Sequence, residues 1–320
     1  MDKNKAAYLF PGQGAQYPGM ALDFLSANAV KTLFDMASDI FGKDVKELLQ
    51  SDADTLKRTD VSQPVITLAN LAAAAFLGEQ GYSPAACAGF SLGEYAALVS
   101  AGVLDAADCL RLVKARGEAM QKTSDALRKA SGGDASAAPG MAAIVGLAPA
   151  QVEELIAQWS AAGFKDLYAA NINSPKQVAV SGTAAALTEA ETRFKEAGAK
   201  RVIRLQVAGP FHSPLMSSSA DAFAPVLESV TFRDPVVPVY SNVTGKRIAS
   251  GAEAKKLALA QITSPVRWVE EEAAIAQAGI EACLEAGPGK VLQGLWRDSG
   301  SEIPVCAAGT IDDISKIGSN

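Results

Sequence analysis

A serine stands between two glycines in the stretch "CAGFSLGEYAAL", residues 87–98. The pattern Gly-Phe-Ser-Leu-Gly, centred on Ser91, follows an apolar segment typical of a buried strand and precedes a helical pattern. Such a context can expose a serine hydroxyl as a nucleophile and point the N–H groups at the start of the helix towards it. The same pattern also fits a serine that only caps the following helix. These residues alone leave both interpretations open.

A serine hydroxyl needs a base to become a nucleophile at neutral pH. The chain has one histidine, His212, in the proline-containing and therefore restricted stretch "VAGPFHSPLM". If the base is an imidazole, it must be His212, although a lone histidine is more often an ordinary surface or core residue. No carboxylate is singled out as the group that would orient the imidazole, and a backbone carbonyl or an amide side chain would also serve.

A third stretch, "LFPGQGAQYPGM" at 9–20, combines glycine and proline after a predicted strand. Ligands of α/β proteins bind where such loops leave the carboxyl ends of the strands. The glycines beside Gln13 would let its backbone N–H approach a reacting oxygen, but a plain surface turn is the alternative. The spacing is neither Gly-x-Gly-x-x-Gly nor a Walker motif, so it gives no support for binding of a nucleotide phosphate.

The elements that must position these residues alternate between short apolar runs and longer helical patterns. This alternation predicts an α/β fold with a parallel sheet that is covered by helices on both faces. We expect strands at 6–10, 85–90, 237–243 and 281–287, and helices at 64–80, 93–102, 105–122, 218–229, 252–261 and 268–279.

The middle of the chain predicts a second unit of the order βαββαβ, which is a ferredoxin-like arrangement. We expect strands at 140–147, 167–174, 177–182 and 201–207, and helices at 148–163 and 183–199. A small subdomain at 140–207 is thus inserted into a large domain formed by 1–139 and 208–320. The Gly-, Ala- and Ser-rich segment 129–140 is expected to be a surface loop.

The composition fits a folded enzyme that works without nucleic acid or membrane. Of 320 residues, 49% are hydrophobic, and 29 basic residues face 35 acidic ones, with no block of like charge. The four cysteines show no Cys-x-x-Cys spacing, which favours reduced thiols in the cytoplasm. The most apolar helical stretch, from Pro64, is expected to fall short of a membrane span. We expect a cytoplasmic monomer.

With these pieces assembled, the chain resembles the malonyl-CoA:acyl-carrier-protein transacylase family, which includes the discrete enzyme of type II fatty-acid synthesis and the acyltransferase domains of polyketide synthases. The resemblance extends from Leu9 to about Leu295. It is carried, in order, by "FPGQGAQYPGM", "SQPVI", "GFSLGEYAALVSAGVL", "RGEAMQ", "GMAAIVGL", "ANINSPKQVAVSG", "GPFHSPLM", "SNVTG", "QITSPVRW" and "EAGPGKVLQGL".

The resemblance implies an α/β-hydrolase-like core with an inserted ferredoxin-like subdomain. It also implies a ping-pong transfer of malonyl from malonyl-CoA to the phosphopantetheine thiol of acyl carrier protein, with no metal or other cofactor. In this family Ser91 would match the acyl-carrying nucleophile and His212 its general base. The main-chain carbonyl of Gln261 would orient the histidine. The backbone N–H groups of Gln13 and Leu92 would form the oxyanion hole.

The resemblance further implies a set of substrate-binding side chains. Arg116 would pair with the free carboxylate of malonyl, because a guanidinium offers a planar fork that fits a carboxylate. Gln63 and Asn173 would line the cleft. Phe211 resembles the bulky residue of malonyl-selective members. Phe90 stands where many members have histidine, which would alter the pocket floor and leave the mechanism intact.

Several alternatives stay open. The chain could be a free-standing acyltransferase that serves a polyketide or polyunsaturated-lipid synthase, or a serine thioesterase or other hydrolase, or a scaffold without activity. Because acyl carrier proteins are acidic, a basic surface should border the cleft. Its candidates in the small subdomain are Arg193, Lys195, Lys200, Arg201 and Arg204, which could equally be solvated helix charges.

Overall fold

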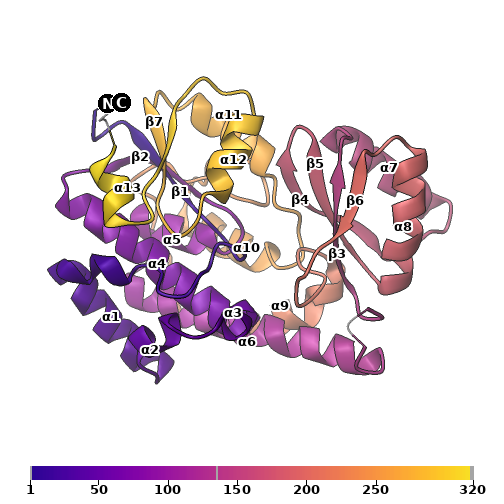
Figure 1. Cartoon of the computed structure of the whole chain (residues 1–320), viewed down its shortest axis with the longest axis horizontal. Helices are drawn as coiled ribbons and strands as arrows, with labels where there is room; N and C mark the ends of the chain where they lie inside the picture. The colour runs from indigo at the N-terminus through magenta and orange to yellow at the C-terminus, as the bar shows by residue number, and fades with distance from the viewer. Residues whose placement is uncertain (1, 135, 318–320) are drawn as a thin grey trace.

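A parallel four-stranded sheet forms one half of the molecule (Figure 1). The computed structural model describes residues 2–134 and 136–317. The strand order is β2-β1-β7-β8, so the first strand of the chain lies in the middle of the sheet. The strands are β1 (Ala6–Phe10), β2 (Pro84–Gly89), β7 (Ala282–Glu285) and β8 (Val305–Ala307).

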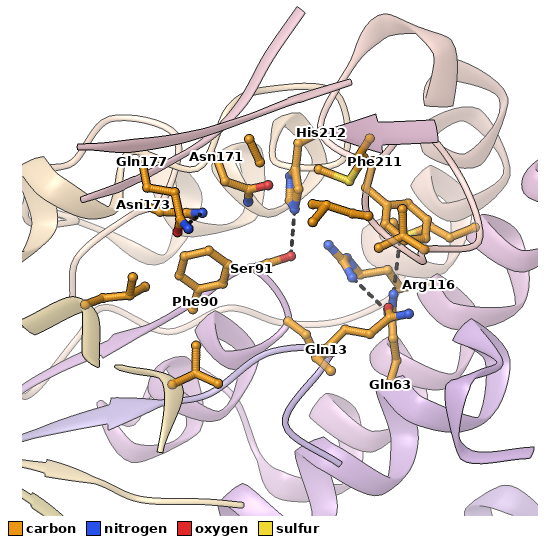
Figure 2. A pocket seen from close by; sticks show the side chains of 18 residues that line it. Gln13, Gln63, Phe90, Ser91, Arg116, Asn171, Asn173, Gln177, Phe211 and His212 are labelled. Atoms are coloured by element: carbon orange, nitrogen blue, oxygen red, sulfur yellow. Dashed lines mark hydrogen bonds between the residues drawn. The ribbon is translucent and has the colours of Figure 1, made fainter. Parts of the chain in front are cut away.

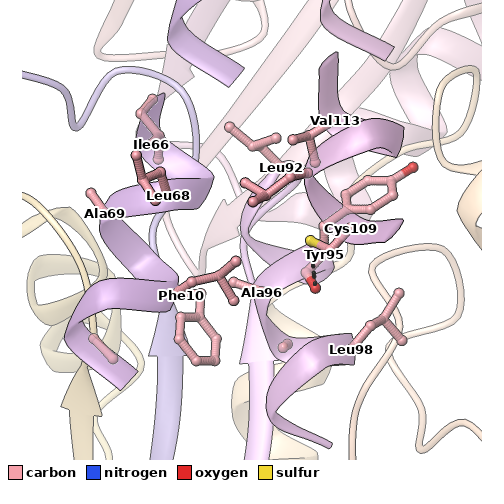
Figure 3. Close-up of a cluster of buried hydrophobic side chains, with 14 of the residues drawn as sticks. Phe10, Ile66, Leu68, Ala69, Leu92, Tyr95, Ala96, Leu98, Cys109 and Val113 are labelled. Atoms are coloured by element: carbon pink, nitrogen blue, oxygen red, sulfur yellow. Dashed lines mark hydrogen bonds between the residues drawn. The ribbon is translucent and has the colours of Figure 1, made fainter. Parts of the chain in front are cut away.

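Side chains of β1 alternate between two hydrophobic clusters, one on each face of this sheet. Tyr8 and Phe10 join the larger cluster, and Ala7 and Leu9 join the smaller one, as the two-residue period of a strand requires. Part of the larger cluster, where α4 (Thr59–Glu79), α5 (Gly93–Ser100) and α6 (Ala106–Ala130) meet Phe10, is shown in Figure 3. The first helices are η1 (Leu22–Ser26), α1 (Asn28–Phe41), α2 (Val45–Leu49), α3 (Ala53–Lys57), α4 (Thr59–Glu79), α5 (Gly93–Ser100) and α6 (Ala106–Ala130). The later ones are η2 (Pro214–Met216), α9 (Ser217–Glu228), α10 (Gly251–Ala260), α11 (Trp268–Ala276), α12 (Val291–Asp298) and α13 (Ile311–Ser315).

Helix α4 corrects one prediction. It begins at Thr59 and not at Pro64, so the proline lies inside its second turn, where only one hydrogen bond to the preceding turn is lost. By length and composition α4 could cross a membrane, contrary to the expectation that this stretch is too short. However, 78% of the most apolar 18-residue stretch of α4 is buried inside the fold, as in the core helix of a folded domain.

A second sheet, antiparallel and of the order β4-β5-β3-β6, forms the other half of the molecule. Helices α7 (Pro149–Ala161) and α8 (Ala184–Glu196) cover its outer face (Figure 1). The chain order βαββαβ together with this strand order is the ferredoxin-like arrangement. The prediction of an α/β fold with a parallel core and a ferredoxin-like unit is confirmed. The elements are β3 (Gly140–Val145), α7 (Pro149–Ala161), β4 (Leu167–Ser174), β5 (Gln177–Gly182), α8 (Ala184–Glu196) and β6 (Arg201–Arg204).

Other predicted bounds were wrong in detail. Segment 237–243 is not a regular strand: it pairs with β2 only around Cys87, because Pro238 has no N–H and interrupts the ladder. Helix α6 was expected to end at 122 but continues to Ala130, which shortens the loop expected at 129–140. Ala135 of that loop lies outside the described residues. The sequence patterns predicted neither α1 nor the three-residue strand β8.

Candidate active site

Ser91 lies on a sharp turn between β2 and α5. Its backbone is in the left-handed region, with φ at 51°, a conformation that non-glycine residues rarely adopt. The flanking glycines are required by close packing: a Cβ at Gly89 would lie 2.0 Å from the carbonyl carbon of Gly93, and one at Gly93 would lie 2.0 Å from the carbonyl oxygen of Phe10. The glycines therefore let strand, turn and helix approach one another, which lifts Ser91 above the end of the sheet.

His212 lies directly opposite Ser91, although 121 positions separate them in the chain (Figure 2). The Oγ atom of Ser91 is 2.7 Å from Nε2 of His212, and Nδ1 of His212 is 2.9 Å from the backbone carbonyl oxygen of Gln261. Because a carbonyl can only accept, Nδ1 carries the proton and Nε2 of the neutral ring is free to accept one. This arrangement can activate a serine hydroxyl without a carboxylate.

The surroundings of His212 keep its imidazole neutral. Burial, followed by the positive charge of Arg116, lowers the pKa of His212 to about 4, while the hydrogen bond to Gln261 acts in the opposite direction. The backbone of His212 is also left-handed, with φ at 57°. The buried Ser181 of β5 donates a hydrogen bond to the carbonyl oxygen of the preceding Phe211 and so ties this loop to the second sheet.

Arg116 is fully buried where α6 crosses α4. The two helices approach closely at Gly117, where a Cβ would lie 2.9 Å from the carbonyl oxygen of Thr59. The guanidinium donates to Oε1 of Gln63 at 2.8 Å and to Oε1 of Gln261 at 2.9 Å, and its Nε has no partner among the described residues. Burial lowers the pKa of Arg116, but a guanidinium stays charged. The hydrogen bonds of the guanidinium to other described residues go only to neutral amides, so this buried charge is suited to receiving an anion.

These groups open into one cavity of about 230 Å³ at the junction of the two sheets (Figure 2). Ser91 and His212 lie between a side that carries Arg116 and a side that carries Asn173 and Phe90. The Phe90 ring packs edge-on against Trp268, with the ring centroids 5.5 Å apart. The residues expected from the sequence that line the cavity are Gln13, Gln63, Phe90, Ser91, Leu92, Arg116, Asn173, Phe211 and His212.

Two backbone N–H groups are available beside the serine. Gln13 follows β1 and Leu92 precedes α5, and the two segments meet because the N–H of Phe90 donates to the carbonyl of Phe10. The N–H groups of Gln13 and Leu92 have no hydrogen-bond partner among the described residues. Free N–H groups at such a position can stabilise a developing oxyanion.

Sequence reasoning missed several polar residues of the site. Asn171 and Gln177 line the cavity, and Asn173 donates to Gln177 at 3.1 Å. Asn242 accepts a hydrogen bond from the N–H of Ser91, and Glu94 accepts one from the N–H of Asn242. Asn242 belongs to the "SNVTG" stretch and Glu94 to "GFSLGEY". Both stretches stood out by their resemblance to the family, which gave these two residues no role.

The site can be compared with known proteins. Residues 7–312 match the acyl transferase domain family. The chain is similar to the malonyl CoA-acyl carrier protein transacylase of Synechocystis sp., at 36% identity over 98% of this chain and 100% of the relative. It is also similar to the protein of that name from Escherichia coli strain K12, at 39% identity over 91% of each chain.

Solved structures show the same relationship. A crystal structure of an acyl carrier protein S-malonyltransferase from Vibrio cholerae matches with a TM-score of 0.89 and 35% identity, over 98% of this chain and all of the other. A malonyl-transacylase solved in complex with a type II polyketide-synthase acyl-carrier protein matches with a TM-score of 0.88 and 34% identity, over 98% of each chain.

Proposed function

The chain belongs to the acyl transferase domain family, as its sequence motifs predicted, and on that premise we propose that it transfers malonyl from malonyl-CoA to the phosphopantetheine thiol of an acyl carrier protein. The acyl group would travel as an ester on Ser91. The names of the similar proteins support both the donor and the acceptor of this transfer.

The observation that carries the proposal is the buried Arg116 in the cavity that holds the Ser91–His212 pair. Malonyl ends in a carboxylate, which a guanidinium can bind through two parallel hydrogen bonds. Acetyl and longer neutral acyl groups would leave the buried guanidinium without an anion hydrogen-bonded to it, which is costly. The site thus favours a malonyl thioester over neutral ones.

In the first half-reaction, Nε2 of His212 takes the proton of the Ser91 hydroxyl as its oxygen attacks the malonyl thioester carbonyl. The N–H groups of Gln13 and Leu92 would hold the resulting oxyanion. When the tetrahedral intermediate collapses, the carbon–sulfur bond breaks, and His212 returns the proton to the sulfur of coenzyme A. Malonyl remains on Ser91 as an ester. The carbonyl of Gln261 stabilises the imidazolium that forms on the way.

The second half-reaction reverses these steps with a new thiol. His212 takes the proton of the phosphopantetheine thiol, the sulfur attacks the Ser91 ester, and the serine oxygen leaves and regains the proton. The first step exchanges a thioester for an ester and the second exchanges that ester for a new thioester, so the overall transfer is close to balanced in energy. Each proton is handled by His212, and the proposed reaction therefore calls for no cofactor.

The remaining cavity residues would select the acyl group and hold the donor. Phe211 is 7% exposed and lines the cavity, where its ring would oppose branching at the α-carbon of the acyl group. Gln63 holds Arg116, and Asn173 would contribute polar contacts on the opposite side of the cavity. Phe90 would form the apolar floor, supported by Trp268.

We propose fatty-acid synthesis as the pathway, and a polyketide carrier protein as the alternative acceptor, because a similar transacylase binds one. The acceptor would meet a basic surface of the small subdomain. Two of the candidate basic residues are paired, Arg193 with Glu189 and Lys195 with Glu191. The other three are exposed and have no paired carboxylate among the described residues: Lys200, Arg201 and Arg204. Assays with purified carrier proteins of both kinds would separate the pathways, and Lys200→Glu should slow transfer to the preferred one.

The proposal is tested by intact-protein mass spectrometry after incubation with malonyl-CoA. The wild-type chain should gain one malonyl group, which then moves to added carrier protein, and the Ser91→Ala variant should gain none. An adduct that persists in Ser91→Ala would exclude Ser91. Release of free malonate faster than transfer to carrier protein would identify a hydrolase instead.

The domain organisation, oligomeric state and location of the chain are also part of the proposal. We propose that residues 140–207 form a small subdomain inserted into a large domain of residues 1–139 and 208–320. The strands of the antiparallel sheet and helices α7 and α8 all lie within 140–207, which supports this division. A cytoplasmic monomer fits both substrates, which are soluble.

A further inference from the structure

Side chains from distant parts of the chain hold the backbone of Ser91 at both ends. Its N–H donates to Oδ1 of Asn242 at 2.6 Å, and its carbonyl oxygen accepts from Nε2 of Gln261 at 3.1 Å. Left-handed backbone costs free energy for any residue with a Cβ, so it persists only where the surroundings impose it. Asn242 is placed to impose it on the nitrogen side.

Asn242 is in turn fixed through each of its other donors. Its backbone N–H donates to Oε2 of Glu94 at 2.7 Å, and its Nδ2 donates to the carbonyl oxygen of Gly89 at 2.7 Å and to Oε1 of Glu271 at 2.8 Å. Because two acceptors face Nδ2, the amide oxygen must face Ser91. Asn242 and Glu271 are fully buried and Glu94 is 1% exposed, so solvent cannot replace these bonds.

We propose that Asn242 is a positioning residue that holds Ser91 in its left-handed conformation, and that the buried carboxylates of Glu94 and Glu271 hold Asn242 in the orientation this requires. The inference rests on the proposed function, because it takes Ser91 to be the nucleophile. It adds a layer of residues beneath the nucleophile that the roles assigned from the family do not include.

The two carboxylates argue for positioning over stability alone. Apolar side chains of similar volume would serve a core as well or better, because burying a carboxylate costs free energy. Burial indeed raises the pKa of Glu94 to about 7. The hydrogen bond from the N–H of Asn242 and the charge of Arg116 both act to lower this pKa, but burial outweighs them. Burial and then the charge of Glu94 raise the pKa of Glu271 as well. Both groups converge on Asn242, and through it on the turn that carries Ser91.

Asn242→Ala tests the proposal through the reactivity of Ser91. The readouts are the rate of labelling by a fluorophosphonate, which reports the hydroxyl independently of malonyl recognition, and kcat and KM for malonyl-CoA. We expect labelling and kcat to fall about 10²-fold with KM little changed, as for a small misplacement of a reacting group. Wild-type labelling and kcat in a folded Asn242→Ala variant would overturn the proposal.

A matched pair on α11 separates positioning from loss of stability. Glu271→Leu and Glu272→Leu each remove a buried carboxylate, but Glu272 bonds to the indole of Trp268 and not to Asn242. Each substitution takes a hydrogen-bond acceptor from a buried donor, so both variants should lower the melting temperature. Only Glu271→Leu should slow labelling, by about tenfold or more. Equal labelling rates in the two variants would overturn the role of Glu271. If malonyl-CoA fails to acylate the wild-type chain, the proposed function fails, and the labelling rates still decide this inference.

Discussion

The hydroxyl oxygen of Ser91 lies 2.7 Å from Nε2 of His212, on the side of the ring opposite the nitrogen that is bound to the carbonyl of Gln261. The geometry fixes one tautomer, in which His212 accepts the serine proton. His212→Ala is therefore expected to slow acylation of Ser91 by at least about 10³-fold and to leave malonyl-CoA binding nearly intact. Rapid-quench mass spectrometry measures the first quantity and calorimetry the second. Acylation near the wild-type rate would exclude His212 as the base.

The pKa of His212 can be measured without assignment, because the chain has no other histidine. Burial and the nearby Arg116 place this pKa at about 4, against an ordinary value of 6.5. In tag-free protein, the imidazole NMR signals should hold their neutral shifts through pH 6, and the acylation rate should decline only as the pH approaches 4. Arg116→Met should raise this pKa. Titration of the wild-type imidazole near its ordinary value would contradict the buried, neutral ring.

The same shift predicts how stability depends on pH. His212 has a lower pKa folded than unfolded, so its contribution is fully present above pH 6.5 and is lost as the pH falls through about 4. The full loss is on the order of 3 kcal/mol. Denaturant unfolding of wild type and His212→Gln between pH 7 and 4 should show a smaller decline in the variant. Parallel declines would indicate that His212 is not shielded from protons in the folded state.

The sequence was most informative where chemistry follows from local context. The turn at Ser91 could be predicted because its glycines lie within two residues of it, and His212 because the chain offers no second imidazole. The class of fold followed from the alternation of strands and helices along the chain. These features depend on residues that are neighbours in the sequence or, for His212, on the number of histidines in the chain.

The residues that hold the turn could not be found in this way. Asn242 is 151 positions from Ser91, and Glu271 is 29 positions from Asn242, so their contacts exist only after the sheet and helices have packed. In the sequence, Glu271 is one of three consecutive glutamates and is indistinguishable from a solvated helix face. The contacts of the Gln261 side chain with Arg116 and Ser91 could not be predicted for the same reason.

Arg116 should set the preference for malonyl. Arg116→Ala removes up to two charge-assisted hydrogen bonds to the substrate carboxylate, so kcat/KM for malonyl-CoA should fall roughly 10²-fold or more. The kcat/KM for acetyl-CoA should rise relative to the kcat/KM for malonyl-CoA. Lys114→Ala is the matched control, because Lys114 lies on the same helix, pairs with Glu118 at the surface and does not line the cavity. If the ratio of kcat/KM for malonyl-CoA to that for acetyl-CoA is the same in Arg116→Ala as in the wild type, the guanidinium is excluded as the site of the substrate carboxylate.

Two helical glycines offer a test of the packing that raises Ser91 above the sheet. A Cβ at Gly93 would lie 2.0 Å from the carbonyl oxygen of Phe10, whereas a Cβ at the exposed Gly294 of α12 meets nothing within 4 Å. Gly93→Ala must push β1 and α5 apart, and we expect a loss of roughly 3 kcal/mol or more in unfolding free energy, with loss of Ser91 labelling. Gly294→Ala should instead gain about 0.5–1 kcal/mol from helix propensity and keep full labelling. Similar unfolding free energies for the two variants would show that the turn tolerates a wider separation of strand and helix than the structure implies.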